Sequence, residues 1–212
     1  MTTTGTTTRF GLIRHAQTIW NREKRIQGHQ DAPLTPEGDR QAGNWRAQLM
    51  KMNWDRILSS DTGRALKTAE RINEALELPI SSDPRLREQD WGAWTGKTKI
   101  ELEREAPEDL AKARSLGWEF RPPAGENRRQ VWSRSLKALK AGAINWPGKT
   151  ILVVTHEGVI RSLIYRLSGR NFLPTETPLI RPYHLHWLRL DSNGLQIERI
   201  NALALKSGLP PD

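Results

Sequence analysis

Three short apolar runs, each followed by a helical pattern, constrain the fold of this chain most. The runs cover residues 8–13, 56–59 and 151–154, and Ile151-Leu152-Val153-Val154 is the clearest buried strand. Helical periodicity follows in residues 42–50, 65–76 and 158–167. Strands that alternate with helices are typical of an α/β layered fold with a largely parallel sheet.

Local signals support several of these elements. Thr35-Pro36-Glu37 has the order of an N-cap, a first-turn proline and a first-turn acid, so we expect a helix to begin there. Gly169 suits the end of the helix over 158–167. The other predicted elements are a short strand at Ile80, a helix over 126–144, and a hairpin of strands 185–190 and 195–200 around Asp191-Ser192-Asn193-Gly194.

The middle of the chain differs in composition from the rest. Residues 96–127 are rich in charge and contain three prolines, Pro107, Pro122 and Pro123. We predict a helix from Lys97 towards Glu105, a further helical stretch and then a loop. The chain is therefore predicted to be one domain, 1–212, with an insertion at about 96–127 that covers the site.

Composition narrows the class of protein. Of 212 residues, 27% are charged and 36% hydrophobic, there is no cysteine, and no apolar run reaches the ~20 residues of a membrane span. The start, MTTTGTTTRF, lacks the features of a secretory signal, and we expect a frayed terminus there. The expected location is cytoplasmic. Disulfides, thiolate metal sites and cysteine nucleophiles are excluded.

The net charge of +9 has two interpretations. A basic surface can bind nucleic acid or anionic lipid, or the charge can line a pocket for an anionic substrate. The basic residues are scattered, without a long Lys/Arg run. We therefore favour a small anionic substrate, with no nucleic-acid and no membrane partner.

Polar side chains follow all three predicted strands. Arg14 and His15 follow the first, Ser59, Ser60 and Arg64 the second, and Thr155 and His156 the third, in a fold class that binds ligands at the carboxyl ends of strands. Two histidines and two arginines would then converge. Guanidinium forks match phosphoryl oxygens, and a neutral imidazole is a nucleophile near pH 7. Transfer of a phosphoryl group to such a nucleophile also needs an acid that protonates the leaving oxygen.

The chain resembles the histidine phosphatase superfamily, which includes cofactor-dependent phosphoglycerate mutases and many small-molecule phosphatases. The order and spacing of several fragments carry this resemblance across most of the chain. They are Arg14-His15, Thr18, Asn21, Arg25, Gly28, Asp31, Pro33-Leu34-Thr35, Gly38, Gln41-Ala42, Ser59-Ser60, Arg64-Ala65, Thr68-Ala69, Leu86, Glu88, Gly92, Trp94, Gly96, Gly125-Glu126 and Val154 to Arg161.

The resemblance implies a three-layer sandwich of the phosphoglycerate mutase type, with a mostly parallel central sheet flanked by helices. It also implies roles. His15 would become a phosphohistidine, and Glu88 would protonate the leaving group. The phosphoryl oxygens would be held by Arg14, Arg64, His156 and Asn21, beside a loop at Gln27 and Gly28. The family needs no metal and the predicted hydrolysis no cofactor.

Some assignments stay open. Ala16, Gln17 and Asn127 stand where the family often has Gly, Glu and Ser, and Asp90 competes with Glu88 as the acid. The predicted function is metal-independent hydrolysis of small phosphate monoesters through His15. The alternatives are a phosphoglycerate mutase, which Gln89-Asp90-Trp91-Gly92-Ala93-Trp94 disfavours, and a basic nucleic-acid-binding module with an inactive site. The substrate and the oligomeric state are open, a homodimer being one option.

Other residues have competing interpretations. Arg64 could pair with Asp61 instead of a ligand. His184 and His186 share one side of a predicted strand, but no acidic or cysteine partner lies close to support a metal. His29 is expected near the pocket mouth. Three tryptophans, Trp91, Trp94 and Trp118, are candidates for an apolar wall of the pocket, whereas Trp45 and Trp187 are expected in packing.

Overall fold

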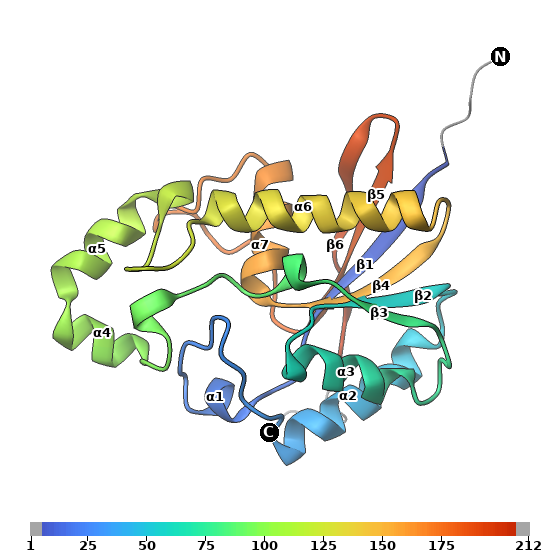
Figure 1. Cartoon of the computed structure of the whole chain (residues 1–212), viewed down its shortest axis with the longest axis horizontal. Coiled ribbons are helices and arrows are strands. Elements are labelled where there is room, and N and C mark those ends of the chain that lie inside the picture. The colour runs from blue at the N-terminus through green and yellow to red at the C-terminus, as the bar shows by residue number, and fades with distance from the viewer. Residues whose placement is uncertain (1–5, 207–212) are drawn as a thin grey trace.

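A six-stranded sheet forms the centre of the computed structural model, which describes residues 6–206 (Figure 1). The strand order is β3-β2-β4-β1-β5-β6. The strands β1 to β4 pair in parallel, and β5 and β6 add an antiparallel hairpin beside β1. Their bounds are β1 Thr8–Arg14, β2 Arg56–Ser59, β3 Ile80–Ser82, β4 Thr150–Thr155, β5 His184–Asp191 and β6 Gly194–Ala204.

Helices cover both faces of the sheet. The helices α6 (Arg128–Asn145) and α7 (Glu157–Leu167) lie on one face, and α2 (Pro36–Leu49) and α3 (Gly63–Asn73) lie on the other (Figure 1). Alternate side chains of β4 enter the two cores: Ile151 and Val153 face α6 and α7, while Leu152 and Val154 face α2 and α3. This confirms the predicted three-layer α/β sandwich with a mostly parallel sheet.

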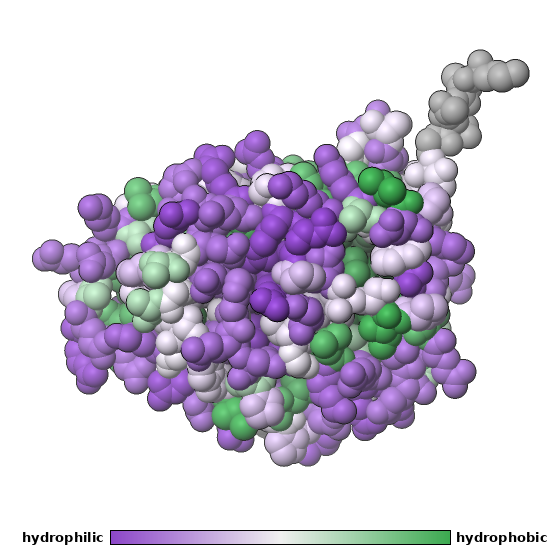
Figure 2. Space-filling model, viewed as in Figure 1, coloured by the Kyte–Doolittle hydropathy of each residue, from purple (hydrophilic) through white to green (hydrophobic). Residues whose placement is uncertain are grey.

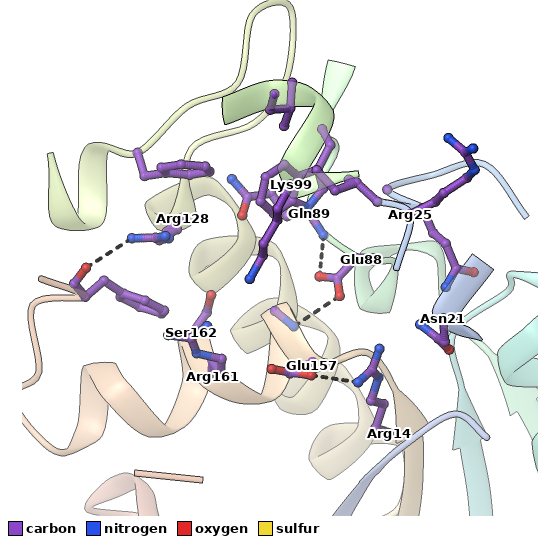
Figure 3. A pocket seen from close by; sticks show the side chains of 18 of the residues that line it. Arg14, Asn21, Arg25, Glu88, Gln89, Lys99, Arg128, Glu157, Arg161 and Ser162 are labelled. Carbon is purple, nitrogen blue, oxygen red and sulfur yellow. Dashed lines mark hydrogen bonds and ion pairs between the residues drawn. The ribbon is translucent and has the colours of Figure 1, made fainter. Parts of the chain in front are cut away.

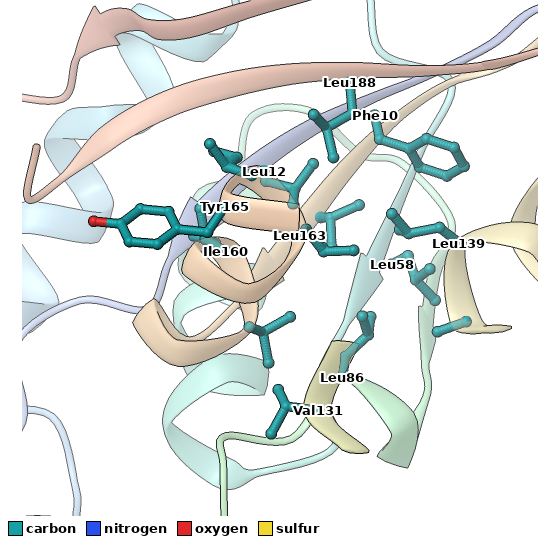
Figure 4. Close-up of a cluster of buried hydrophobic side chains, with 14 of the residues drawn as sticks. Phe10, Leu12, Leu58, Leu86, Val131, Leu139, Ile160, Leu163, Tyr165 and Leu188 are labelled. Atoms are coloured by element: carbon teal, nitrogen blue, oxygen red, sulfur yellow. The ribbon is translucent and has the colours of Figure 1, made fainter. Parts of the chain in front are cut away.

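The core beneath α6 and α7 is built from buried side chains (Figure 4). Phe10 and Leu12 of β1 pack there with Leu163 of α7 and Leu139 of α6. This packing fixes α7 against the sheet, and the N-terminus of α7 therefore lies beside the end of β4, where the predicted site is located.

The predicted insertion contains two helices and one turn. They are α4 (Lys99–Glu105), α5 (Pro107–Ser115) and the 3₁₀ turn η3 (Gly117–Glu119). Two further 3₁₀ turns, η1 (Pro84–Leu86) and η2 (Gly92–Trp94), precede the insertion. In Figure 1, α4 and α5 lie at one end of the molecule, away from the sheet. A third core holds this segment together through Trp94, Leu102, Leu110 and Phe120.

Most sequence-predicted elements occur with small shifts in their ends. The helix expected over 126–144 begins at Arg128, because Asn127 forms a capping box with Gln130. Gly169 has φ +68° just after α7, as expected for a residue that ends a helix. The short helix α1 (Ile19–Arg22) was not predicted. The terminus predicted to fray lies largely outside the described residues.

The surface is mostly hydrophilic in the view of Figure 2, and its apolar side chains lie in small separate groups. Within residues 6–206, no helix combines the length and the hydropathy that a membrane crossing requires.

Candidate active site

The register of the parallel strands brings the two predicted histidines together. Arg14, the last residue of β1, pairs with Thr155, the last residue of β4. His15 and His156 therefore leave neighbouring strands at the same level, and their ring centroids are 5.1 Å apart. Both rings are buried. The structure thus forms the predicted convergence at the carboxyl edge of the sheet.

The His15 ring is held as a neutral nucleophile would need to be. Its Nδ1 lies 2.8 Å from the carbonyl oxygen of Ala16, and because a carbonyl only accepts, the proton belongs on Nδ1. The lone pair of Nε2 is then free. Burial, followed by the charges of Arg14 and Arg64, holds the pKa of His15 well below its usual value. The ring is accordingly uncharged at neutral pH.

The ring of His156 is held through Nε2, whereas that of His15 is held through Nδ1. Its Nε2 lies 2.9 Å from Ser60 Oγ and 3.3 Å from Thr62 Oγ1. Its Nδ1 is buried and has no partner among residues 6–206. Burial also lowers the pKa of His156, with Arg64 as the next cause. A buried nitrogen without a partner is a group that a ligand can satisfy.

Arg64 is fully buried and holds the loop that precedes α2. Its Nη1 donates to the carbonyl of Gln30 at 2.7 Å and to Asp31 Oδ1 at 3.0 Å, and its Nη2 donates to the carbonyl of Gly28 at 2.8 Å. The alternative pairing with Asp61 is wrong, because Asp61 forms a bidentate ion pair with Arg87 at 2.7 and 2.6 Å. The Nε of Arg64 has no protein partner within residues 6–206.

Arg14 has a carboxylate partner that sequence reasoning missed. Glu157, the first residue of α7, accepts from Arg14 Nη1 at 2.7 Å (Figure 3). Both side chains line the cavity described below. The only sequence signal for this pair was the position of Glu157 directly after His156.

The Glu88 carboxylate is fixed by two backbone N–H groups. Gln89 N donates to Oε1 at 2.7 Å and Gly158 N donates to Oε2 at 3.1 Å (Figure 3). A side chain at Gly158 would overlap Oε1, so the glycine allows the carboxylate to sit there. Asp90, the competing acid, accepts from Gly92 N at 2.9 Å and does not line the cavity.

One further arginine, also missed from the sequence, holds the backbone around Glu88. Arg134 donates to the carbonyl oxygens of Arg85, Arg87 and Glu88 at 2.6–2.8 Å. Its Nε and Nη2 each lie 2.8 Å from the Glu126 carboxylate. This half-buried ion pair fixes the path of the chain that presents Glu88.

The remaining predicted phosphate-binding residues lie between β1 and α2, with Asn21 in α1 and with Gln27 and Gly28 on the loop that follows it. Asn21 accepts from Thr18 N at 3.1 Å through Oδ1, which leaves its NH₂ group as the donor on the cavity side. Gln27 is buried, and its Oε1 has no protein partner within residues 6–206. Gly28 adopts φ +54°, where a side chain would be strained and would crowd Trp91 N. All three residues line the cavity.

The cavity has a volume of about 320 Å³ and extends from His15 to the insertion. Its inner wall contains Arg14, His15, Asn21, Gln27, Gly28, Arg64, Glu88 and Glu157, whereas His156 is not part of the lining. Its outer wall is contributed by the insertion, by the first residue of α6 and by the segment after α7: Lys99, Leu102, Leu110, Arg114, Phe120, Arg128 and Phe172. This mixture of a polar end and an apolar wall is typical of small-molecule sites.

Some expectations for the pocket wall are wrong. Trp91 lines the cavity, but Trp94 and Trp118 do not, because Trp94 is buried in the third core and Trp118 packs on Phe172 with ring centroids 4.8 Å apart. His29 does not line the cavity itself, but it follows Gly28, which does, and it lies 3.9 Å from Glu126. Trp45 and Trp187 are buried in packing, as predicted.

The two histidines of β5 do not form a metal site in the described part of the chain, where no group of three or more potential ligands occurs. The Nδ1 of His184 lies 2.7 Å from the carbonyl of Pro182. His186 is buried and its Nδ1 accepts from Asn201 N at 3.2 Å. Burial lowers the pKa of His186 to about 4, so the ring is neutral and structural.

Comparison with known proteins identifies the class. A family model described as the histidine phosphatase superfamily (branch 1) matches residues 10–203. The chain is 35% identical over 167 residues to a Cronobacter sakazakii protein named probable phosphoglycerate mutase GpmB, with 74% of each chain covered. It is 32% identical over 158 residues to the uncharacterized phosphatase PhoE of Bacillus subtilis, covering 74% of this chain and 76% of that relative.

Solved structures agree with this class. Bacillus stearothermophilus YhfR superposes with a TM-score of 0.84 at 30% identity, covering 93% of this chain and 98% of its own. A mycobacterial glucosyl-3-phosphoglycerate phosphatase superposes with a TM-score of 0.79 at 27% identity, covering 93% and 100%. The chain belongs to the histidine phosphatase superfamily. Its relatives include proteins named as mutases and as phosphatases.

Proposed function

We propose that this protein hydrolyses small phosphate monoesters through a phosphohistidine on His15, without a metal ion. The observation that carries the proposal is the neutral, oriented His15 ring beside two arginines and a fixed carboxylate. A ring protonated on Nδ1 offers Nε2 to phosphorus, and the charges of Arg14 and Arg64 balance those of the phosphoryl oxygens.

In the proposed reaction, the Nε2 of His15 forms a bond to phosphorus as the ester P–O bond breaks. Glu88 gives a proton to the leaving oxygen, and the alcohol departs. Glu88 then takes a proton from water, which attacks the phosphohistidine and releases phosphate. Arg14, Arg64, His156 and the NH₂ of Asn21 hold the phosphoryl oxygens in both steps, with Gln27 and Gly28 shaping the loop beside them.

The size and chemistry of the cavity support a small substrate. A cavity of about 320 Å³ suits a metabolite-sized molecule, and residues 96–127 act as a cap over it. The solved relatives include a glucosyl-3-phosphoglycerate phosphatase, which supports hydrolysis. The relative named as a probable phosphoglycerate mutase keeps a mutase as the second candidate.

The test measures phosphate release from a panel of monoesters in the presence of EDTA. We expect wild-type activity, loss of at least about 10³-fold in His15→Ala, and near wild-type activity in His184→Ala, a histidine outside the cavity. Activity that survives in His15→Ala, or none in the wild type, contradicts the proposal. Phosphoglycerate isomerisation that requires a bisphosphate primer would assign a mutase instead, and tight salt-sensitive binding of DNA or RNA without hydrolysis would assign a binding module.

A further inference from the structure

Two arginines share one aromatic ring at the outer part of the cavity. The guanidinium carbon of Arg128 lies 4.4 Å from the Phe172 ring centroid, and that of Arg161 lies 5.2 Å from it. Arg128 also covers the Phe120 ring at 4.3 Å, and Arg161 covers the Tyr165 ring at 5.2 Å. Both arginines line the cavity. The two cationic groups are therefore brought together where a ligand would lie.

Neither arginine has a carboxylate partner. Over residues 6–206, no carboxylate oxygen lies within 4.0 Å of the guanidinium of Arg128 or Arg161. Other arginines of the cavity wall are paired: Arg25 with Glu101 at 3.3 Å, and Arg114 with Glu103 at 3.1 Å. Burial lowers the pKa of Arg128 to about 9, and the charge of Arg161 acts in the same direction. An anion at this place would offset the repulsion between the two groups.

The arginine pair lies away from the catalytic end of the cavity. The cavity runs along α7, because Glu157, Gly158, Arg161 and Ser162 all line it. Arg161 is one helical turn beyond Glu157, about 6 Å further along the helix axis. In the view of Figure 3, Arg128 and Arg161 lie on one side of the cavity and Arg14 lies on the other. The apolar side chains of Trp91, Leu102 and Phe120 also line the cavity.

We propose that Arg128 and Arg161 bind a second anionic group of the substrate, at the other end of the cavity from the phosphoryl group. This inference rests on the proposed function and narrows it. The substrate class is a phosphate monoester whose alcohol carries an oxyanion, either a carboxylate or a second phosphoryl group, beyond a partly apolar linker. Guanidinium forks bind both oxyanions in bidentate geometry, and the ring faces hold the forks in place.

Arg128 also has a structural contact, which decides the choice of variant. Its Nη1 donates to the carbonyl of Gly117 at 2.8 Å and so joins α6 to the cap. Arg161 has no hydrogen-bond or ion-pair partner within the described residues, so its replacement removes a charge and leaves the backbone contacts intact. Arg161→Gln is therefore the test variant. Arg166→Gln is the matched control, because Arg166 is exposed on the same helix and outside the cavity.

The experiment compares kcat/KM for phosphate monoesters of ω-hydroxybutanoate, ω-hydroxyhexanoate and ω-hydroxyoctanoate with the corresponding primary amides. A second arm compares the bisphosphates of the matching diols with their monophosphates. In the wild type and in Arg166→Gln, we expect an anionic ester of suitable length to be preferred by about 10- to 100-fold. In Arg161→Gln, we expect most of that preference to disappear, while hydrolysis of the neutral amides changes little.

The two arms identify the oxyanion. A preference in the carboxylate arm alone assigns a carboxylate, and one in the bisphosphate arm alone assigns a second phosphoryl group. No preference in either arm, or a preference that Arg161→Gln retains, overturns the inference, although the neutral amides would still be hydrolysed through His15.

A binding measurement separates this inference from the proposed function. Titration calorimetry with the phosphonate analogues of the same carboxylates and amides needs no turnover. Tighter binding of the phosphonocarboxylate, lost in Arg161→Gln, supports the second anion site even if no ester is hydrolysed. Equal binding of the two phosphonates overturns it.

Discussion

Replacing Gly158 by alanine tests the role of Glu88 without changing the carboxylate itself. The added methyl group would overlap Glu88 Oε1 and lie 3.1 Å from the carboxyl carbon, whereas carbon atoms pack best at about 3.5–4.0 Å. The carboxyl group must therefore move by roughly 1 Å, which also weakens its hydrogen bond from Gly158 N.

The magnitude follows from that displacement. A misplacement of about 1 Å costs on the order of 10²-fold in rate, and a general acid contributes about 10²–10⁴-fold. For an alkyl phosphate we expect kcat/KM, which covers the steps up to departure of the leaving group, to fall by about 10²-fold in Gly158→Ala. For p-nitrophenyl phosphate, whose leaving group needs little protonation, we expect a loss below about 10-fold. Glu88→Gln should show the same contrast between the two substrates.

The assay is steady-state hydrolysis of the two substrates by folded protein, with thermal unfolding recorded for each variant. Gly43→Ala is the matched control, because a methyl group there lies 3.5 Å from Arg71 Nη2, an ordinary contact between α2 and α3. The control should keep full activity and gain up to about 1 kcal/mol of stability from helix propensity. Equal losses on both substrates in Gly158→Ala would refute the assignment of Glu88 as the acid.

Two further predictions concern charge. Glu157→Gln should lower the inhibition constant of inorganic phosphate by about 3-fold, because the anion no longer competes with a carboxylate for Arg14. Glu198→Gln, which removes the partner of Arg9, serves as the control. Weaker inhibition in Glu157→Gln would contradict the reasoning. Because the folded pKa values of His15 and His156 are lowered, the unfolded chain binds protons that the native protein does not, and stability should fall as pH drops below about 6.5. Urea unfolding at several pH values measures the slope of the free energy of unfolding against pH. In His15→Asn we expect this slope to be smaller by about 1.4 kcal/mol per pH unit. An unchanged slope would mean that the native His15 ring takes up the proton.

Much of the site could be predicted because it depends on sequence order. Polar residues stand at the carboxyl ends of the apolar runs, so the sequence alone could place Arg14, His15 and His156 at one edge of the sheet. Apolar runs also predicted the strands, because all four residues from Ile151 to Val154 are apolar, as expected for a strand that is buried on both faces of the sheet. The helix α1 was missed because four residues are too few to show a period.

The parts that could not be predicted depend on contacts between distant segments. Arg134 reads as one of several polar residues on α6, and only the fold places it against the carbonyls around Glu88. Phe172, on the segment between α7 and β5, carries no motif, yet it lines the cavity beneath two arginines. Trp118 was misplaced for the same reason, since its partner Phe172 is distant in sequence.

The buried polar atoms without a protein partner have a consequence for folding. Within residues 6–206, seven buried side-chain atoms form no hydrogen bond, although one of them, Arg71 Nε, lies 3.2 Å from Asp39 Oδ2. Four of the seven belong to residues of this site: Arg14 Nε, Gln27 Oε1, Arg64 Nε and His156 Nδ1. Each unmet group lowers the stability of the native state by about 1–3 kcal/mol. A phosphoryl group bound as proposed would satisfy them, and we expect its binding to raise the free energy of unfolding with the logarithm of its concentration. We therefore expect the stability of the protein to increase with the concentration of its substrate and product, through the same atoms that serve the proposed reaction.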